Sequence, residues 1–434
     1  METAATLPNV LARVDHALRR LRAITLVAAM AAGWAQYSTA VSLVARPVAT
    51  NVYEVTAYGA VGDGVTDSSA GARAAMAAAS ATGGMVHFAA GHYVFKTAYK
   101  KPAASMQVRG TLPITIAGDG ASSTVLTQQV SGQGLLSVQV DGTVVQGLTL
   151  DTQTGNGGVA IGVQANNTTL QNAAVLGPSS TFALYYIGPG GATPDNGLVN
   201  TGNKVLNTAV NDLFPNDGFS FSYQSGGLIQ NIDHTGSRLA LYRVQDTTVD
   251  GYRYTPGPQP GGTNGFYITP PSRNITITNF VSTGQGGIIG RGSIATRFSS
   301  NITIRDEHVQ MLGGFHLTIG DVDGLTLSGC RFGADDWISV KPNYAAKNVV
   351  VENCTVPAIR FTPAAAASIT NLQFNSCTFP RYQPTTKGAL QTFFHTGDGP
   401  TDFVVNGGTW LNRSGGFFKG SNTTYQVYNL AGYP

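Results

Sequence analysis

Charged side chains are scarce in this chain: Asp, Glu, Lys and Arg make up 11% of its 434 residues. The formal net charge is only +3 and no Lys/Arg-rich run passes through the body of the chain, so no nucleic-acid-binding surface is predicted. The three cysteines show no CxxC or Cys/His spacing, so neither a metal site nor a cofactor is predicted. The charge-free segment 23–35 is too short for a transmembrane helix, so no membrane span is predicted.

One motif of eight residues recurs instead, and its copies begin about 20 to 35 residues apart, which is typical of a solenoid. The copies are TVVQGLTL (143–150), TTLQNAAV (168–175), NKVLNTAV (203–210), GLIQNIDH (227–234), TTVDGYRY (247–254), ITITNFVS (275–282), ITIRDEHV (302–309), LTLSGCRF (325–332), VVVENCTV (349–356) and LQFNSCTF (372–379). The third and sixth places are mostly apolar, as expected of side chains that point into a core. The fifth place is always small or turn-forming: Gly147, Asn172, Asn207, Asn231, Gly251, Asn279, Asp306, Gly329, Asn353 and Ser376. Because Gly, Asn and Asp tolerate the left-handed backbone conformation, we predict a tight bend there between two short parallel strands.

The sixth place carries Cys330, Cys354 and Cys377 in three successive copies, 24 and 23 residues apart. We predict that these thiols stack in an inner column and behave as small buried apolar groups. A disulfide between two neighbours is the alternative.

A second series of segments alternates apolar and polar residues, which predicts strands with one face inward and one toward solvent. The series is GGVAIGV (157–163), TFALYYIG (181–188), GFSFSYQ (218–224), RLALYRV (238–244), GFYITP (265–270), GIIGRGS (287–293), GFHLTIG (314–320), DWISVKP (336–342), AIRFTP (358–363) and ALQTFFHT (389–396). Each coil then contributes one such strand and one bent pair. The predicted fold is all-β: a right-handed parallel β-helix of about ten to twelve coils.

The chain divides into a helical segment over residues 1–50, the β-helix over 51–420 and a tail over 421–434. In the first part, apolar residues follow the 4–3 spacing of a short coiled coil: Leu7, Leu11, Val14, Leu18 and Leu21. This spacing favours an uncleaved anchor that gathers identical chains, which suggests a homotrimer. Residues 23–35 equally fit the core of a secretion signal, so both hypotheses stay open.

Residues 53–95 resemble the opening of the pectate-lyase-like superfamily, which includes polysaccharide lyases, glycoside hydrolases and phage tailspikes. The matching residues are Tyr58, Gly59, Ala60, Gly62, Asp63, Gly64, Asp67, Gly83, Gly84, Phe88, Gly91 and Tyr93. We expect Asp67 to cap a helix over about 70–81 that covers the open end of the first coil. Asp63 and Asp67 are therefore expected to be structural.

The resemblance implies that a glycan binds the solvent face of the sheet formed by the second series. The alternation places there Ser220, Ser222, Tyr242, Tyr267, Thr269, His316, Thr318, Ser339, Lys341, Arg360 and Thr362, with Arg291 between them and Asp217, Asp335 and Asp336 at strand entries. We expect Tyr242, Tyr267, Arg291 and Asp217 to bind substrate, the two tyrosines as a stacking platform.

Two chemistries are open for that face. In a hydrolase, Asp335 or Asp336 would supply one of two carboxylates. In a lyase, Lys341 and Arg360 would hold a uronate while His316 or Tyr267 takes the proton. Asp335 and Asp336 could instead simply terminate a turn.

The row beside the bend is the second candidate surface, with charges of both signs: Asp233, Arg253, His308 and Arg331 at the seventh place and Asp250, Arg305 and Glu352 at the fourth. Such a row is equally typical of a solvated ladder. Glu307 occupies the apolar sixth place, which predicts a bulge or a buried pair because a lone buried carboxylate is costly.

These features predict a protein that recognises a polysaccharide and degrades it as a lyase or glycoside hydrolase. The leading hypothesis is a virion tailspike or tail fibre that acts on a host surface glycan and joins other virion tail proteins through its N-terminus. The alternatives are a non-catalytic glycan-binding or structural fibre and a secreted bacterial enzyme.

Overall fold

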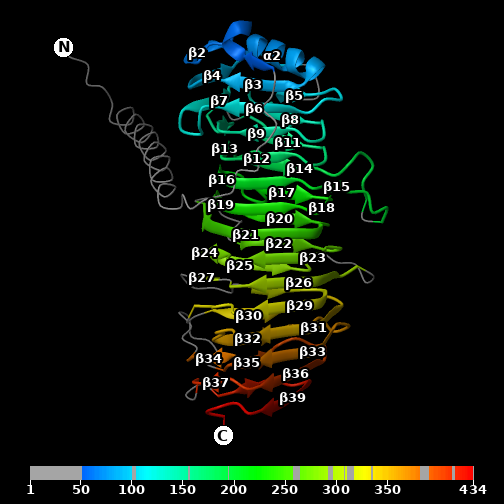
Figure 1. The fold of residues 1–434 in the computed structure, drawn as a ribbon. Helices are drawn as coiled ribbons and strands as arrows, with labels where there is room; N and C mark the ends of the chain where they lie inside the picture. Colours follow the sequence, from blue (N-terminus) through cyan, green and yellow to red (C-terminus); the bar gives the residue numbers. More distant parts are fainter. Residues whose placement is uncertain are drawn as a thin grey trace, which may run out of the picture. The chain divides into compact units, whose positions relative to one another are not determined.

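A computed structural model describes residues 51–433 except 100–103, 155–156, 194, 258–263, 292–296, 307, 310–316, 334–335, 382–390 and 413–415. The described chain is a stack of parallel strands with a helical cap at its first coil (Figure 1). This confirms the predicted β-helix.

The cap consists of the 3₁₀ helix η1 (Val55–Tyr58) and the helix α2 (Ser69–Thr82). Asp67 Oδ1 accepts hydrogen bonds from the Ser69 N–H at 3.0 Å and from the Lys96 N–H at 3.1 Å, so it joins the start of α2 to the second coil. The α2 face of small residues, which includes Ala72 and Ala75, is completely buried. The predicted capping helix is therefore confirmed, and Asp67 has the structural role expected of it.

Thirteen parallel strands form one sheet, which we call the 13-stranded sheet. They are β5 (Ala104–Val108), β8 (Gly134–Val138), β11 (Ile161–Val163), β14 (Leu184–Tyr186), β17 (Phe219–Ser222), β20 (Leu239–Tyr242), β22 (Asn264–Thr269), β25 (Gln285–Ile289), β28 (Leu317–Ile319), β30 (Trp337–Val340), β32 (Ala358–Phe361), β35 (Phe393–His395) and β38 (Phe418–Lys419). All ten segments of the predicted second series lie in it. The sheet exceeds the predicted ten to twelve coils because β5, β8 and β38 lie outside the recognised repeats.

The other strands form a 24-stranded sheet and a separate pair, β34 (Thr378–Phe379) and β37 (Thr409–Trp410), and the bend divides them into two walls. The first wall holds β1 (Val52–Glu54), β3 (Gly84–Phe88), β6 (Ile114–Gly118), β9 (Val144–Gln146), β12 (Thr169–Gln171), β16 (Lys204–Asp212), β19 (Leu228–Gly236), β21 (Gln245–Pro256), β23 (Arg273–Thr278), β26 (Ser299–Arg305), β29 (Val322–Ser328), β31 (Ala345–Glu352), β33 (Ser368–Asn375), β36 (Thr401–Asn406) and β39 (Thr423–Tyr428). The second wall holds β2 (Asp63–Asp67), β4 (Gly91–Phe95), β7 (Thr124–Gln128), β10 (Thr149–Asp151), β13 (Ala174–Gly177), β24 (Val281–Ser282), β27 (His308–Val309), β34 (Thr378–Phe379) and β37 (Thr409–Trp410), together with the later parts of β16, β19 and β21. Two short strands, β15 (Asn200–Thr201) and β18 (Gln224–Ser225), pair beside the first wall.

The predicted bend is confirmed in every one of the ten repeats. All ten fifth-place residues have positive φ, from 47° at Asn207 to 70° at Gly329. A second left-handed bend, which the repeat alignment did not identify, lies within the first-wall strands β23, β26 and β31, at Asn274, Asn301 and Asn348. There the Asn301 Nδ2 donates to Asn274 Oδ1 at 2.8 Å, so successive coils are also joined by an amide ladder.

The interior confirms the predicted thiol column. Cys330, Cys354 and Cys377 are free and at most 1% exposed. The Cys330 N–H donates to Cys354 Sγ at 3.2 Å, which places the two side chains on adjacent coils. The alternative of a disulfide is therefore wrong.

The β-helix also continues beyond the predicted boundary at residue 420. Strand β39 lies within the segment expected to be a tail, and it pairs with β36 over Thr401↔Thr423 to Asn406↔Tyr428. The segment 423–428 is therefore the last rung of the first wall. The predicted N-terminal helical segment lies outside the described residues.

Candidate functional site

The outer face of the 13-stranded sheet brings the predicted site residues into register. Tyr267 pairs with Ile288, Thr318 with Ser339, and Ser339 with Arg360 on successive strands. Small residues form a floor on this face, where Thr318 is 9% and Ser339 is 7% exposed. Larger side chains rise around the floor, so the face is shaped to receive a ligand that lies across several coils.

A cluster that we call the tyrosine cluster lies over β17, β20 and β22 and contains Asp217, Arg238, Tyr242 and Tyr267. Arg238 Nε donates to Asp217 Oδ1 at 2.5 Å, and the Tyr242 hydroxyl donates to Asp217 Oδ2. The Arg238 guanidinium lies 4.4 Å from the centroid of the Tyr267 ring. Asp217 is 7% exposed and accepts hydrogen bonds from two donors, so it orients Arg238 and Tyr242, while its role in binding substrate stays a prediction.

The two tyrosines do not form the flat platform that their register suggested. Their ring centroids are 6.0 Å apart, but the rings are nearly perpendicular, at 89°. Burial raises the pKa of Tyr242, and the hydrogen bond to Asp217 raises it further. Burial also raises the pKa of Tyr267, against an opposing effect of Arg238 and Arg291. Both hydroxyls are therefore protonated at neutral pH and suited to donate rather than abstract a proton.

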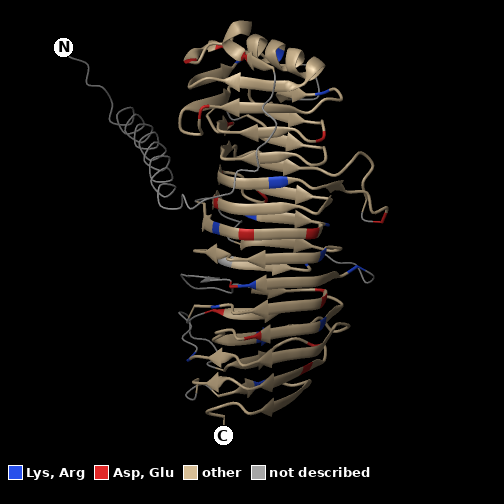
Figure 2. Cartoon of the chain, in the orientation of Figure 1, with Lys and Arg blue, Asp and Glu red and all other residues tan. Residues whose placement is uncertain are grey.

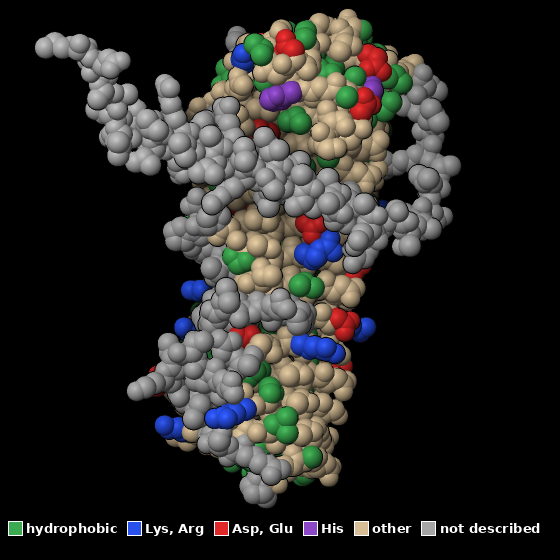
Figure 3. All heavy atoms as spheres, turned by 90° about the vertical axis from the view of Figure 1, so that its left-hand side faces the viewer, with side chains coloured by type: hydrophobic (Ala, Val, Ile, Leu, Met, Phe, Trp, Pro, Cys, Tyr) green, Lys and Arg blue, Asp and Glu red, His purple; other side chains and the backbone are tan. Residues whose placement is uncertain are grey.

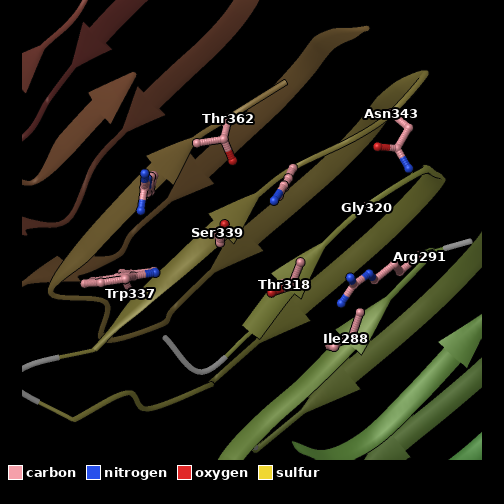
Figure 4. A pocket seen from close by; sticks show the side chains of 10 residues that line it. Ile288, Arg291, Thr318, Gly320, Trp337, Ser339, Asn343 and Thr362 are labelled. Carbon is pink, nitrogen blue, oxygen red and sulfur yellow. The ribbon is translucent and has the colours of Figure 1, made fainter. Parts of the chain in front are cut away.

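A pocket of about 390 Å³ lies farther along the same face (Figure 4). We call it the cationic pocket, and it is lined by Ile288, Arg291, Thr318, Gly320, Trp337, Ser339, Lys341, Asn343, Arg360 and Thr362. Figure 4 shows Trp337 at one end of its strand, with Arg291 and Asn343 toward the opposite end. Among the described lining residues three are cations and none is a carboxylate, which suits an anionic ligand that also offers an apolar face to an indole.

The structure brings together some of the predicted site residues and separates others. Arg291, Lys341 and Arg360 meet in the cationic pocket as expected. Asp336 does not reach the outer face: it is completely buried, and its Oδ2 accepts the Gly333 N–H at 2.6 Å. Asp336 thus fits the alternative in which it terminates a turn. Asp335 and His316 lie outside the described residues.

The row beside the bend has the character of a solvated ladder. Arg253 donates to Asp233 through two nitrogens, and the Arg253 side chain is 53% exposed. Asp250 accepts hydrogen bonds from the Gln230 and Asn279 side chains of the neighbouring coils. Glu307, the residue that set this row apart, lies outside the described residues.

Sequence reasoning missed a buried polar network inside the coils of β16, β19 and β21. His234 Nε2 lies 2.5 Å from Asp212 Oδ2, and His234 Nδ1 lies 2.5 Å from the Tyr252 hydroxyl. The Ser237 hydroxyl donates to Asp212 Oδ1 at 3.0 Å. A signal was available, because His234 stands at the eighth place of its repeat, where most copies have an apolar residue.

The Asp212 network lies next to the tyrosine cluster. The Ser237 hydroxyl that binds Asp212 also accepts the Gly218 N–H at 2.6 Å. Gly218 directly follows Asp217, and Ser237 directly precedes Arg238. The buried network therefore fixes the backbone that carries the Asp217–Arg238 pair.

Comparisons with known proteins agree with this fold. Residues 52–243 match the family model described as rhamnogalacturonase A/epimerase, pectate lyase-like. The catalytic unit of a GH87 α-1,3-glucanase from Streptomyces thermodiastaticus strain HF3-3 has a similar structure, with 16% identity, a TM-score of 0.54, and coverage of 91% of this chain and 70% of that one. The Agl-KA catalytic domain is similar at 15% identity and a TM-score of 0.52, with coverage of 90% and 70%. No curated protein matches the chain. The fold is the pectate lyase-like right-handed β-helix.

Proposed function

We propose that this protein binds and modifies an acidic polysaccharide that lies across the outer face of the 13-stranded sheet. The observation that carries the proposal is the convergence of Arg291, Lys341 and Arg360 around one pocket whose lining includes Trp337. Cations neutralise the carboxylates of a uronate chain, and the indole packs on the apolar face of a sugar ring. Charged residues are sparse along the described coils (Figure 2), so three cations around one pocket are a local concentration of charge.

The same pocket favours chemistry at the carbon next to the carboxylate. Neutralising a uronate carboxylate lowers the pKa of the adjacent C–H, whose proton a base then removes. Loss of the leaving group on the neighbouring carbon completes an elimination, whereas return of a proton to the opposite face completes an epimerisation. Tyr267, as a protonated hydroxyl, suits the donor role, while Lys341 and Arg360 hold the carboxylate. His316 keeps its predicted role as the proton acceptor as a proposal.

A glycoside hydrolase is the second candidate, and it is supported less well by the described residues. Hydrolysis uses two carboxylates that flank the bond. Asp217 is held by Arg238 and Tyr242, and Asp336 is buried against Gly333. Asp335 keeps its predicted catalytic role as a proposal.

The cellular setting is also a proposal. The family match and the similarity to solved glucanase domains support a polysaccharide-active enzyme over a virion tailspike, and a secreted setting stays a prediction. It stays a prediction that the protein binds a glycan without catalysis, that it forms a homotrimer, or that it belongs to a virion tail. No helix among the described residues is long and apolar enough to cross a membrane.

The decisive experiment offers the protein polygalacturonate, alginate and neutral α-1,3-glucan in parallel. Unsaturated sugar absorbance reports elimination, proton NMR of the product reports epimerisation, and new reducing ends without unsaturation report hydrolysis. We expect turnover of an acidic polymer only, and loss of at least tenfold, about 1.4 kcal/mol, in Lys341→Ala and Arg360→Ala. Arg305→Ala on the exposed bend row is the charge-matched control. Turnover of the neutral glucan, or full activity in both pocket variants, would refute the proposal.

A further inference from the structure

A second pocket lies at the turn that follows the 13-stranded sheet, several coils before the cationic pocket. It encloses about 240 Å³, and it shares no lining residue with the cationic pocket. We call it the Tyr223 pocket, and the residues that matter most for its chemistry are Tyr223, Arg243, Arg273, Phe298, Leu198 and Ser300. The segment between β14 and β15, which contributes Leu198, projects from the coils (Figure 1).

Tyr223 and Arg243 occupy a left-handed backbone conformation that large side chains rarely adopt. Their φ values are 53° and 55°. Of the other non-glycine residues with positive φ in the described chain, all are Asn, Asp or Ser. The left-handed conformation costs about 1–2 kcal/mol for an ordinary residue, so Asn or Gly at these two sites would stabilise the turn better. The turn itself therefore does not explain why large side chains occupy these two positions.

The two side chains form a cation–aromatic pair that faces the pocket. The Arg243 guanidinium lies 5.3 Å from the Tyr223 ring centroid, and Arg243 Nη1 donates to the Tyr223 hydroxyl. The remaining guanidinium nitrogens of Arg243 make no hydrogen bond to the described residues. Arg273 is exposed, and its side chain likewise has no ion-pair or hydrogen-bond partner in the described part of the chain.

The charge around the pocket is positive. No carboxylate of the described part of the chain lines it. Lys347 Nζ lies 5.9 Å from the centroid of Phe298, which adds a third cation nearby. Three carboxylates lie nearby. Asp195 pairs with Arg297, whereas Asp246 and Asp323 accept hydrogen bonds from the Asn274 and Asn348 side chains, each at 2.7 Å, and keep their charge. Two guanidinium groups that form no ion pair with the described residues lie here beside two aromatic rings. This arrangement suits an anionic sugar, since a guanidinium binds a carboxylate or sulfate through two nitrogens and aromatic rings stack on sugars.

We propose that the Tyr223 pocket is a second binding site for an acidic sugar chain, separate from the site of chemistry. Arg243 and Arg273 bind the anionic groups, and Tyr223 and Phe298 pack against the rings. From β20 to β28 the sheet advances by three strand spacings, roughly 14 Å, so one polymer can occupy both pockets. The inference shares its ligand class with the proposed function but does not require that the cationic pocket be catalytic.

The test isolates this pocket by disabling the other one. A Lys341→Ala/Arg360→Ala parent is titrated calorimetrically with hexagalacturonate, with a carrageenan-type oligosaccharide that carries sulfate but no carboxylate, and with neutral maltohexaose. We expect the parent to bind at least one acidic probe and not maltohexaose. Adding Arg243→Ala or Arg273→Ala should weaken that binding at least tenfold. Arg331→Ala, which removes the same charge from the bend row, should leave it unchanged.

Two further variants separate a binding role from a structural one. Tyr223→Asn keeps a residue that tolerates the left-handed conformation but removes the ring, so it should fold at least as stably and still lose at least tenfold in affinity. Tyr223→Phe keeps the ring and should retain binding. Absence of binding of both acidic probes to the parent, equal binding of maltohexaose, or unchanged affinity in Tyr223→Asn would each overturn the inference. Turnover of polymer by the unmodified protein is measured separately, so failure of the proposed function is distinguishable.

Discussion

Replacing Asp212 by Ala is the sharpest test of how the buried network supports the coils beside the candidate site. Asp212 is 1% exposed, and its two oxygens contact His234 at 2.5 Å and the Ser237 hydroxyl at 3.0 Å. Ala would leave the His234 ring nitrogen and the Ser237 donors unpaired inside the β-helix. Leaving buried donors unpaired in this way typically costs about 1–3 kcal/mol per group.

The matched control is Asp233→Ala. Asp233 directly precedes His234 in β19, so its side chain points to the opposite face of the strand. Asp233 pairs with Arg253 at the surface, where the two side chains are 32% and 53% exposed. Exposed pairs contribute roughly 0–1 kcal/mol, so this variant should unfold almost like the parent. The two substitutions remove the same chemical group, and they differ in burial.

The assay is urea unfolding followed by two probes, because a solenoid can lose coils separately and a single transition cannot be assumed. Far-ultraviolet circular dichroism reports the whole stack, and amide hydrogen exchange reports β17 and β19 individually. We expect Asp212→Ala to unprotect β17 and β19 first. A double variant with His234→Leu should recover part of the loss, since removing both partners leaves no unpaired polar group.

The reasoning would be refuted if Asp212→Ala were no less stable than Asp233→Ala, or if exchange in β17 and β19 were unchanged. A null result would mean that water replaces the carboxylate at no cost. The glycines around Asp212 argue against that outcome: a methyl group at Gly218 would lie 1.9 Å from Asp212 Oδ2, and one at Gly236 would lie 2.5 Å from it. The carboxylate is enclosed by backbone on both sides.

Three further predictions concern the scaffold. Burial raises the pKa of the Cys377 thiol to about 12, so native protein should resist alkylation at pH 8 and react fully in denaturant, whereas labelling of the folded state would contradict the buried column. Burial opposes protonation of His87, but the neighbouring Glu54 and Asp119 outweigh this effect and raise the pKa of His87. The raised pKa stabilises the fold below about pH 6.5, and this stabilisation is lost as pH rises through the folded pKa. The melting temperature of the parent should therefore fall relative to that of His87→Gln over that range. Asn353 has a φ of 54°, so Asn353→Ala should lower stability by about 1–2 kcal/mol while Asn353→Gly is nearly neutral, and equal melting of the two variants would show that the bend is not left-handed in solution.

The repeat fold was predictable because every coil needs the same left-handed bend, and the residues that allow it recur along the sequence. A left-handed bend admits few residue types, so each coil repeats an Asn or Gly at the same place, with apolar residues on either side. Asn172, Asn279 and Asn353 illustrate this, with φ values of 51°, 51° and 54°. The thiol column followed from the same register. The coils that contain β5 and β8 were not predicted because they have no recognised copy of the motif.

The site was less predictable because alternation gives the direction of a side chain but not what covers it. Lys341 and Arg360 were placed correctly, since their outward register leaves them in the cationic pocket. The ion pair of Asp217 was not predicted because its partner Arg238 comes from the next coil, 21 residues away. Asp336 was misjudged because the entry of β30 turns its side chain into the protein, against Gly333. Such contacts depend on how one coil rests on the next.

Charge alone does not distinguish a uronate site from a generally positive surface, but the placement of these cations does. On the face drawn in Figure 3, several basic side chains of the described residues lie beside acidic ones. Lys341 and Arg360 instead rise from the paired strands β30 and β32, where Ser339 pairs with Arg360 and the next outward residue is Lys341. One strand spacing and two residues separate their Cα atoms, roughly 8 Å, which two long side chains can close around a single carboxylate. Arg291 stands on another side of the same pocket, and Trp337 supplies the apolar wall. A rigid stack of coils holds these groups in fixed register, so their grip on one anionic sugar needs little ordering on binding.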